Sequence, residues 1–180
     1  LLTIDVQLKI LGIVCSPRTE GNTEILVRQT LQSAEKEGAE VELWSCIDKH
    51  IEPCNHCGSC LQTNECVIND DMQDLYRKMV DADGLVFGSP VYFYSVTAQA
   101  KLVIDRTYAL RRPENKLRGK VGGAIAVAGR RGQVSALMAL DTFFLAHGMI
   151  PVGMGVESRA SNKGDVRNDE RALTEATELG

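Results

Sequence analysis

Residues 8–23 decide the fold, and they read Leu-Lys-Ile-Leu-Gly-Ile-Val-Cys-Ser-Pro-Arg-Thr-Glu-Gly-Asn-Thr. The first half, Leu8 to Cys15, is almost continuously apolar, which is typical of a strand that is buried on both faces of a sheet. Helical spacing of apolar residues then begins at Thr23 and continues to Glu37. A buried strand followed by a polar loop and a helix predicts a β-α-β unit and a parallel sheet.

The same alternation of strand and helix repeats along the rest of the chain. Glu40 to Leu43 alternates in polarity and the fifth predicted strand contains Pro151, so both strands are expected at the edges of the sheet. The sequence therefore predicts an α/β fold with a doubly wound, five-stranded parallel sheet in the order 2-1-3-4-5. The further strands are expected at residues 40–43, 84–88, 121–128 and 149–156, the further helices at 69–81, 96–108 and 133–147, and a loop at 157–168 before a last helix.

Bulk properties limit the class of protein. The 180 residues are 44% hydrophobic, enough for one domain over residues 1–180. A formal net charge of -4 argues against a nucleic-acid partner, and no apolar run approaches the ~20 residues that span a membrane. The first ten residues, which include Asp5 and Lys9, do not resemble a signal peptide. We therefore expect a cytoplasmic protein.

The loop that follows the first strand has the composition of a phosphate site. It offers the hydroxyls of Ser16 and Thr23, the amide of Asn22 and the cation of Arg18 beside a helix start. It has neither the dinucleotide glycine pattern nor the Walker pattern, because Gly21 is its only glycine. The alternative is an ordinary N-cap, in which a side chain of this loop caps the helix. Its place at the carboxyl end of a central strand favours phosphate.

Two further loops are expected at the same edge of the sheet. After the third strand, Pro90, Val91, Tyr92 and Phe93 form a segment suited to a flat flavin ring, which its aromatic faces and the backbone around Pro90 would hold. The alternative is that Tyr92 to Tyr94 simply pack between strand and helix. After the fourth strand, Gly129 allows a ligand to approach the backbone closely next to Ala128. An ordinary glycine turn with solvated arginines is the alternative for this last loop.

Four cysteines, Cys54, Cys57, Cys60 and Cys66, lie within an insertion over residues 46–68. The spacing Cys-x2-Cys-x2-Cys-x5-Cys lets one wrapping loop direct four thiolates at a compact iron–sulfur cluster. A zinc ion is the alternative to the cluster, because Cys-x2-Cys pairs also build tetrahedral zinc sites. We find no arrangement of acid–base or nucleophilic residues, so we expect no catalytic side chains and a cofactor that carries the chemistry.

These motifs together resemble the iron–sulfur flavoproteins within the group of NAD(P)H-dependent FMN reductases, whose fold is flavodoxin-like. The resemblance covers residues 10–156 and is most specific in the cysteine insertion. It implies a 4Fe–4S cluster on the four clustered cysteines and assembly into a homodimer or homotetramer. It also implies that FMN is held by the phosphate residues Ser16, Arg18, Asn22 and Thr23 and by the ring residues Pro90, Val91, Tyr92, Phe93, Ala128 and Gly129.

Three functions are consistent with this pattern. The first is transfer of electrons between the 4Fe–4S cluster and FMN, with a ferredoxin or NAD(P)H as the donor. The second is an NAD(P)H-dependent FMN or quinone reductase whose cysteine loop is empty or binds zinc, and the third is a redox sensor. Because all three loops follow strands of a parallel sheet, the cluster and the flavin are expected to be neighbours at its carboxyl edge. The helix at 133–147 is apolar on two faces, with Val134, Leu137 and Met138 on one of them, which favours an oligomer.

Overall fold

A computed structural model describes residues 7–180, so the expectations for residues 1–6, including most of the segment examined for a signal peptide, lie outside it. The strands are β1 Lys9–Val14, β2 Glu40–Ser45, β3 Gly84–Tyr92, β4 Ser95–Val96, β5 Val121–Ala128, β6 Ile150–Pro151 and β7 Val156–Arg159. The helices are α1 Asn22–Lys36, α2 Cys60–Thr63, α3 Met72–Asp81, α4 Ala98–Arg106, α5 Gln133–Ala146 and α6 Glu170–Leu179, with 3-10 helices η1 Thr107–Leu110 and η2 Asp165–Asn168.

The central strands form a parallel sheet in the order β2-β1-β3-β5-β6. This is the predicted order 2-1-3-4-5, since β5 and β6 are the fourth and fifth parallel strands along the chain. The half-buried β2 and the strand with Pro151 lie at the two edges, as expected from their sequences. The short strand β4 turns back antiparallel on the end of β3.

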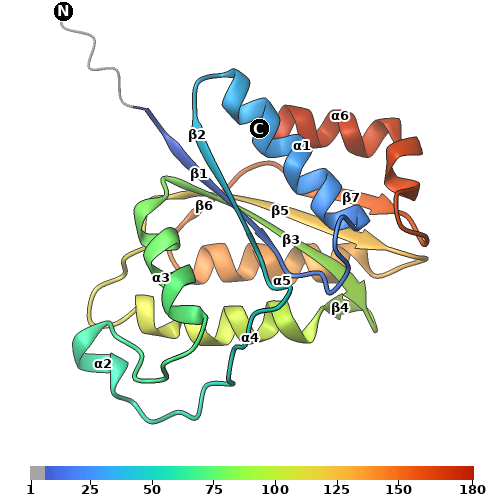
Figure 1. Cartoon of the computed structure of the whole chain (residues 1–180). Coiled ribbons are helices and arrows are strands. Elements are labelled where there is room, and N and C mark those ends of the chain that lie inside the picture. The colour runs from blue at the N-terminus through green and yellow to red at the C-terminus, as the bar shows by residue number, and fades with distance from the viewer. Residues whose placement is uncertain (1–6) are drawn as a thin grey trace, which may run out of the picture.

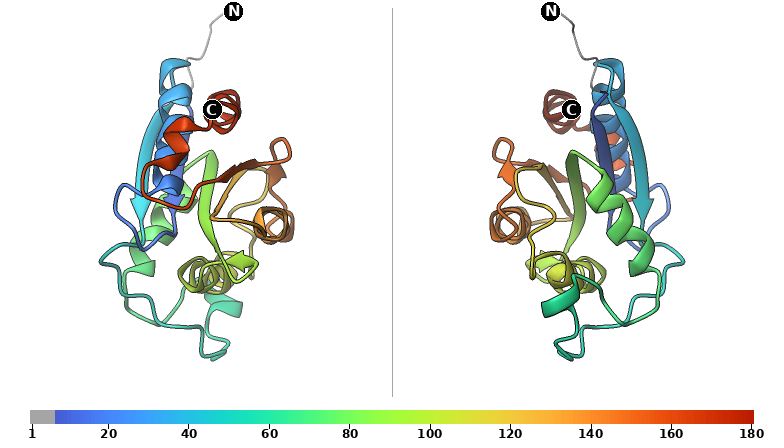
Figure 2. Two further views of the ribbon diagram at one scale, coloured as in Figure 1. Left: turned by 90° about the vertical axis from the view of Figure 1, so that its right-hand side faces the viewer. Right: turned by 90° about the vertical axis from the view of Figure 1, so that its left-hand side faces the viewer.

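Helices cover both faces of the sheet (Figures 1 and 2). Helices α1 and α6 pack on one face, and α3, α4 and α5 pack on the other, so that the sheet separates two apolar cores. Gly88 lets α1 approach the sheet closely, because a Cβ atom there would lie 2.6 Å from Val27 Cγ2 and 2.9 Å from Thr23 Cγ2. This contact positions the first turn of α1 above the carboxyl ends of β1 and β3.

The fifth strand differs from the prediction. Residues 149–156 do not form one continuous strand, because Gly153 and Gly155 adopt left-handed conformations with φ of 66° and 80°. The chain instead pairs with β5 twice, through β6 near its start and through β7 near its end. The predicted loop at 157–168 is therefore partly regular, since β7 extends to Arg159 and η2 occupies Asp165–Asn168.

Helix α5 has one buried and one exposed apolar face. Leu140 and Phe143 are buried against the sheet, whereas Val134 and Met138 are each 64% exposed. Leu137, which the sequence grouped with the second pair, is buried instead. Between residues 7 and 180, none of the helices combines the length and the apolar character needed to cross a membrane.

Candidate functional site

The loops at the carboxyl edge of the sheet enclose a pocket of about 200 Å³, here called the carboxyl-edge pocket. Its walls come from the ends of β1, β3 and β5 and from the segment after β7. Eight of the ten residues proposed from the sequence for a flavin line it, and three further residues complete it. The lining residues are Ser16, Arg18, Asn22, Thr23, Pro90, Val91, Tyr92, Val127, Gly129, Ala160 and Ser161.

The first wall of this pocket is the loop before α1. Gly21 is the N-cap residue of α1, and no side chain among residues 7–180 caps the helix, so the structure does not have the N-cap that was the alternative for this loop. The backbone N–H groups of the first turn therefore remain available to an anion. The Ser16 hydroxyl accepts a hydrogen bond from the Arg18 N–H at 3.2 Å, and the Arg18 guanidinium donates to the Ser161 carbonyl at 3.3 Å.

Asn22 lines the pocket, but its side chain is hydrogen-bonded to the segment after β7. Its amide donates to the Asn162 carbonyl at 2.7 Å, and its carbonyl oxygen accepts from the Gly164 N–H at 2.8 Å. These bonds bring the segment after β7 against the pocket, where the Ser161 hydroxyl donates to the Gly129 carbonyl at 3.1 Å. Sequence reasoning missed this wall because residues 157–168 gave no signal beyond polarity.

Two of the predicted flavin residues do not line the pocket. Phe93 is 99% exposed, and with Tyr94 it forms the two-residue turn between β3 and β4. Both residues have positive φ angles, 47° and 65°, a conformation that is rare for aromatic residues and that is concentrated at functional sites. Ala128 is buried at the end of β5 and is not among the lining residues.

The four clustered cysteines line one cavity of about 80 Å³, here called the cysteine cavity. Burial raises the pKa of the Cys60 thiol, and the nearby thiols of Cys66, Cys54 and Cys57 raise it further, as expected for sulfur atoms gathered in one place. A hydrogen bond with the Ser59 hydroxyl lowers the pKa of Cys57. Within residues 7–180, no three His, Cys, Asp or Glu side chains converge on a point as they would around a single metal ion.

A buried ion pair anchors the cysteine loop, residues 46–68, to the body of the protein. The Arg106 guanidinium at the end of α4 contacts the Asp70 carboxylate at 2.5 Å and 3.1 Å, and both side chains are almost fully buried. Burial raises the pKa of Asp70, but hydrogen bonds from Arg106 and from the N–H groups of Glu52 and Met72 outweigh it and hold that pKa below its ordinary value. Asp70 is therefore a carboxylate that compensates the buried cation.

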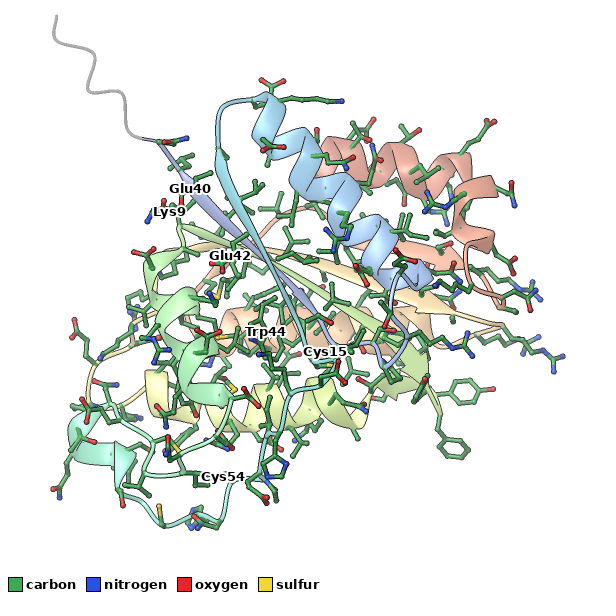
Figure 3. All side chains as sticks on the ribbon, in the orientation of Figure 1. Lys9, Cys15, Glu40, Glu42, Trp44 and Cys54 are labelled. Carbon is green, nitrogen blue, oxygen red and sulfur yellow. The ribbon has the colours of Figure 1, made fainter. Side chains whose placement is uncertain are left out.

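The cysteine cavity and the carboxyl-edge pocket lie at opposite ends of α4. The pocket is lined by residues 90–92, before the helix, and the cavity by Arg106, Tyr108 and Ala109, at its end and beyond it. Nine helical residues span about 13 Å. Figure 3 shows Cys15 at the end of β1 and Cys54 well away from it, in the loop that runs beneath α4. The two sites therefore do not adjoin each other within one chain, because the loop leaves the sheet edge before its cysteines begin.

Comparison with known proteins identifies the family of this chain. The sequence model of the family described as NADPH-dependent FMN reductase matches residues 8–161. The chain belongs to the NADPH-dependent FMN reductase family. Among the relatives of this family member, an iron–sulfur flavoprotein of Methanocaldococcus jannaschii is 42% identical over 96% of this chain and 94% of the relative.

Solved structures show that the fold is flavodoxin-like. RosB with a bound 8-demethyl-8-formylriboflavin 5′-phosphate intermediate has a TM-score of 0.78 at 18% identity, covering 96% of this chain and 75% of RosB. A flavodoxin from the domain Archaea has a TM-score of 0.63 at 16% identity, covering 96% of this chain and 93% of the flavodoxin. With the family match, this family member is an FMN-dependent oxidoreductase.

Proposed function

We propose that this FMN reductase family member transfers electrons between a 4Fe–4S cluster on Cys54, Cys57, Cys60 and Cys66 and FMN in the carboxyl-edge pocket. The observation that carries the proposal is the separation of two sites with different donors. One cavity gathers four thiols, and the other pocket gathers hydroxyls, a guanidinium and a helix start. The first donor set suits iron and sulfide, and the second suits a phosphate.

The residues of the carboxyl-edge pocket fit FMN. The uncapped start of α1, with Ser16, Arg18 and Thr23, would hold the terminal phosphate, while Asn22 would shape the site by fixing the opposite wall. Pro90, Val91, Tyr92 and Gly129 would hold the isoalloxazine ring. Phe93 and Ala128 do not line the pocket and would contribute to the flavin site from outside it. Phe93 lies in the exposed turn, and Ala128 lies at the buried end of β5.

The residues of the cysteine cavity fit a cluster. Cys54 and Cys57 are exposed, whereas Cys60 and Cys66 are half-buried, so the thiols are distributed around a cavity rather than pointed at one ion. The guanidinium of Arg106 lies beside them, and its Nε–H group is buried without an acceptor among residues 7–180, which suits a site that would receive a negatively charged cluster. Once bound, the cluster would exchange single electrons and FMN would exchange one or two.

A second copy of the chain would complete this function. Within one chain α4, which is about 13 Å long, lies between the two sites, so a cluster and a flavin would come closer together only across a subunit interface. The exposed apolar face of α5, with Val134, Met138 and Leu145, is suited to such an interface. We propose a cytoplasmic homodimer or homotetramer in which residues 1–180 form one FMN-binding domain, served by a ferredoxin or NAD(P)H and without nucleic-acid or membrane partners.

The decisive experiment is cofactor analysis of protein purified anaerobically. Acid release followed by chromatography should yield FMN, and iron and sulfide assays should give about four of each per chain with an EPR signal on reduction. Recovery of zinc without sulfide, together with FMN, would instead make the protein the NAD(P)H-dependent FMN or quinone reductase that its family match also allows. Recovery of FAD, or of no flavin after refolding with FMN, would contradict the flavin assignment.

A further inference from the structure

Arg106 is buried in the region where the cysteine loop meets the end of α4. Its side chain is fully buried, and all the hydrogen bonds that this side chain donates within the described part of the chain run to residues 52–70. Nη1 donates to the Glu52 carbonyl at 2.7 Å, and Nη2 lies 3.4 Å from the Ile68 carbonyl. With the two contacts to Asp70, the guanidinium holds both ends of the segment that carries the four cysteines.

The same guanidinium reaches one of the cysteines directly. Nη2 donates to Cys66 Sγ at 3.4 Å, and Arg106 forms part of the wall of the cysteine cavity. Its Nε–H group is buried and has no acceptor among the described residues. A buried donor without an acceptor is unfavourable, so its presence in a residue that lines the cysteine cavity is consistent with a site that would receive a negatively charged group.

We propose that Arg106 sets the reduction potential of the cluster through Cys66, an inference that rests on the proposed function. A charged N–H group that donates to a ligand sulfur withdraws electron density from it and favours the reduced, more negative state of the cluster. Little solvent screens the guanidinium from the sulfur at this buried position, although the Asp70 carboxylate offsets part of its charge. Asp70 fixes the orientation of the guanidinium fork, so that one N–H group is directed at Cys66 while two others bind the carboxylate.

A purely structural role is the competing explanation. Arg106 would then only hold the cysteine loop against α4, and its charge would not affect the midpoint potential of the bound cluster. The two explanations differ in one measurable quantity, the midpoint potential of a cluster that is already assembled. A structural anchor changes iron retention or folding, whereas a potential-setting residue shifts the midpoint in protein that retains its iron.

The test compares three variants of the anaerobically purified, FMN-containing protein by EPR-monitored redox titration. For Arg106→Gln, the equilibrium constant for cluster reduction should fall about tenfold, which is 59 mV lower for a one-electron couple. Arg106→Lys keeps the charge but loses the fork, so its midpoint should lie between those of Arg106→Gln and the wild type. Arg111→Gln, the same substitution at an exposed arginine five positions further along, should match the wild type.

Each outcome decides between the explanations. Wild-type midpoints in both Arg106 variants would overturn the inference, and so would loss of the cluster from both while FMN and the circular dichroism spectrum are retained. If Arg106→Gln does not fold, a midpoint below that of the wild type in Arg106→Lys supports the inference and a wild-type midpoint overturns it. A wild-type protein without iron and sulfide would overturn the proposed function and this inference together, whereas unchanged midpoints in a loaded protein overturn the inference alone.

Discussion

The carboxyl-edge pocket takes its walls from the ends of β1, β3 and β5, whereas the cysteine cavity takes its walls from a loop that leaves the sheet altogether. Ser16 and Thr23 in the pocket are 3% and 2% exposed and belong to segments that pack on the core. Cys54 and Cys57 in the cavity are exposed, and the loop around them contains only the single helical turn α2. The two sites therefore differ in what holds them in place.

This difference indicates how each site responds to damage. The pocket inherits the stability of the sheet, because moving its residues would require moving strands and α1. The cysteine loop depends on the buried Arg106–Asp70 pair, on Asn64, whose side chain bonds the carbonyls of Ala109 and Glu114, and on whatever the thiols bind. We expect the two sites to fail independently, and the following predictions test that independence from the largest expected effect to the smallest.

The largest effect is expected from Cys57→Ala. Loss of one of four thiolates should make the cluster labile, so that stoichiometric iron and one-electron exchange with a ferredoxin-like donor are lost. The carboxyl-edge pocket shares no residue with the cysteine cavity, and FMN absorbance should be retained. Iron assay and flavin absorbance measure the two sites separately in one sample.

Cys46→Ala is the matched control for this prediction. Cys46 is buried at the end of β2 and does not line the cysteine cavity, so the variant should keep its iron. A full complement of iron in Cys57→Ala would show that the ligand assignment is wrong. Loss of FMN from folded Cys57→Ala would show that the two sites are coupled.

A loss of about 3–5 kcal/mol of unfolding free energy is expected for Asp70→Asn, because it leaves the buried Arg106 cation without its counter-charge. The pKa of Asp70 is lowered in the folded state, so its stabilising effect is present above the unfolded pKa near 3.9 and is lost as the pH falls through the lowered value. The difference between variant and wild type in urea unfolding should therefore shrink at low pH. Hydrogen exchange should show the loss first in residues 46–68.

Asp74→Asn provides the comparison for this effect. Asp74 lies four residues further along, and its carboxylate is partly exposed beside Arg77 at 3.3 Å. Exposed pairs contribute about 1 kcal/mol or less, so this variant should unfold almost as the wild type does. Equal losses in the two variants would contradict the view that the cysteine loop depends on the buried pair.

Gly88→Ala is expected to have the opposite effect, which is damage to the carboxyl-edge pocket while the cluster stays intact. The added methyl group would meet Val27 and Thr23 at under 3 Å and push α1 from the sheet, at a cost of about 1–3 kcal/mol. FMN should bind more weakly, because Thr23 lines the pocket, while the iron content stays unchanged. Fluorescence titration of the FMN-free protein with FMN measures the loss of affinity.

Gly84→Ala makes the same change at the other end of β3. Its methyl group would meet Val121 and Ile10 at a similar distance, but the site lies at the amino edge, away from the pocket. We expect a comparable loss of stability with wild-type affinity for FMN. If both variants weakened FMN binding equally, the effect would be one of global stability and not of pocket geometry.

The sequence predicted one of the two sites more completely than the other for a physical reason. Strand periodicity and the rules of parallel sheets locate the loops after β1, β3 and β5, so residues such as Ser16 and Gly129 meet as expected. Loop paths carry no such periodicity, so the position of the cysteines at the far end of α4 was not foreseen. Arg106 was missed because an arginine in a helical pattern is normally expected to face solvent. Ser161 was missed because the sequence around it showed polarity and no other signal.

The smallest effect should come from Ser161→Ala, which tests the wall that the sequence did not reveal. The Ser161 hydroxyl donates to the Gly129 carbonyl at 3.1 Å and joins the segment after β7 to the loop after β5. A hydrogen bond of this kind contributes about 0.5–1.5 kcal/mol, so the dissociation constant for FMN should rise about 2- to 10-fold. Iron content and unfolding free energy should stay close to the wild type, because the residue lies at an exposed rim.

Ser135→Ala, at an exposed position on α5 outside the pocket, should leave the affinity for FMN unchanged and serves as the control. A rise of more than about 100-fold in Ser161→Ala would be too large for the loss of one wall contact, and would mean that the hydroxyl binds the flavin itself. An affinity equal to that of the wild type would mean that the wall is held without the hydroxyl, by the bond from Arg18 to the Ser161 carbonyl and by the bonds of Asn22 to Asn162 and Gly164. Asn22→Ala should then show the larger loss of affinity, still without loss of iron, because the cysteine cavity has no part in this wall.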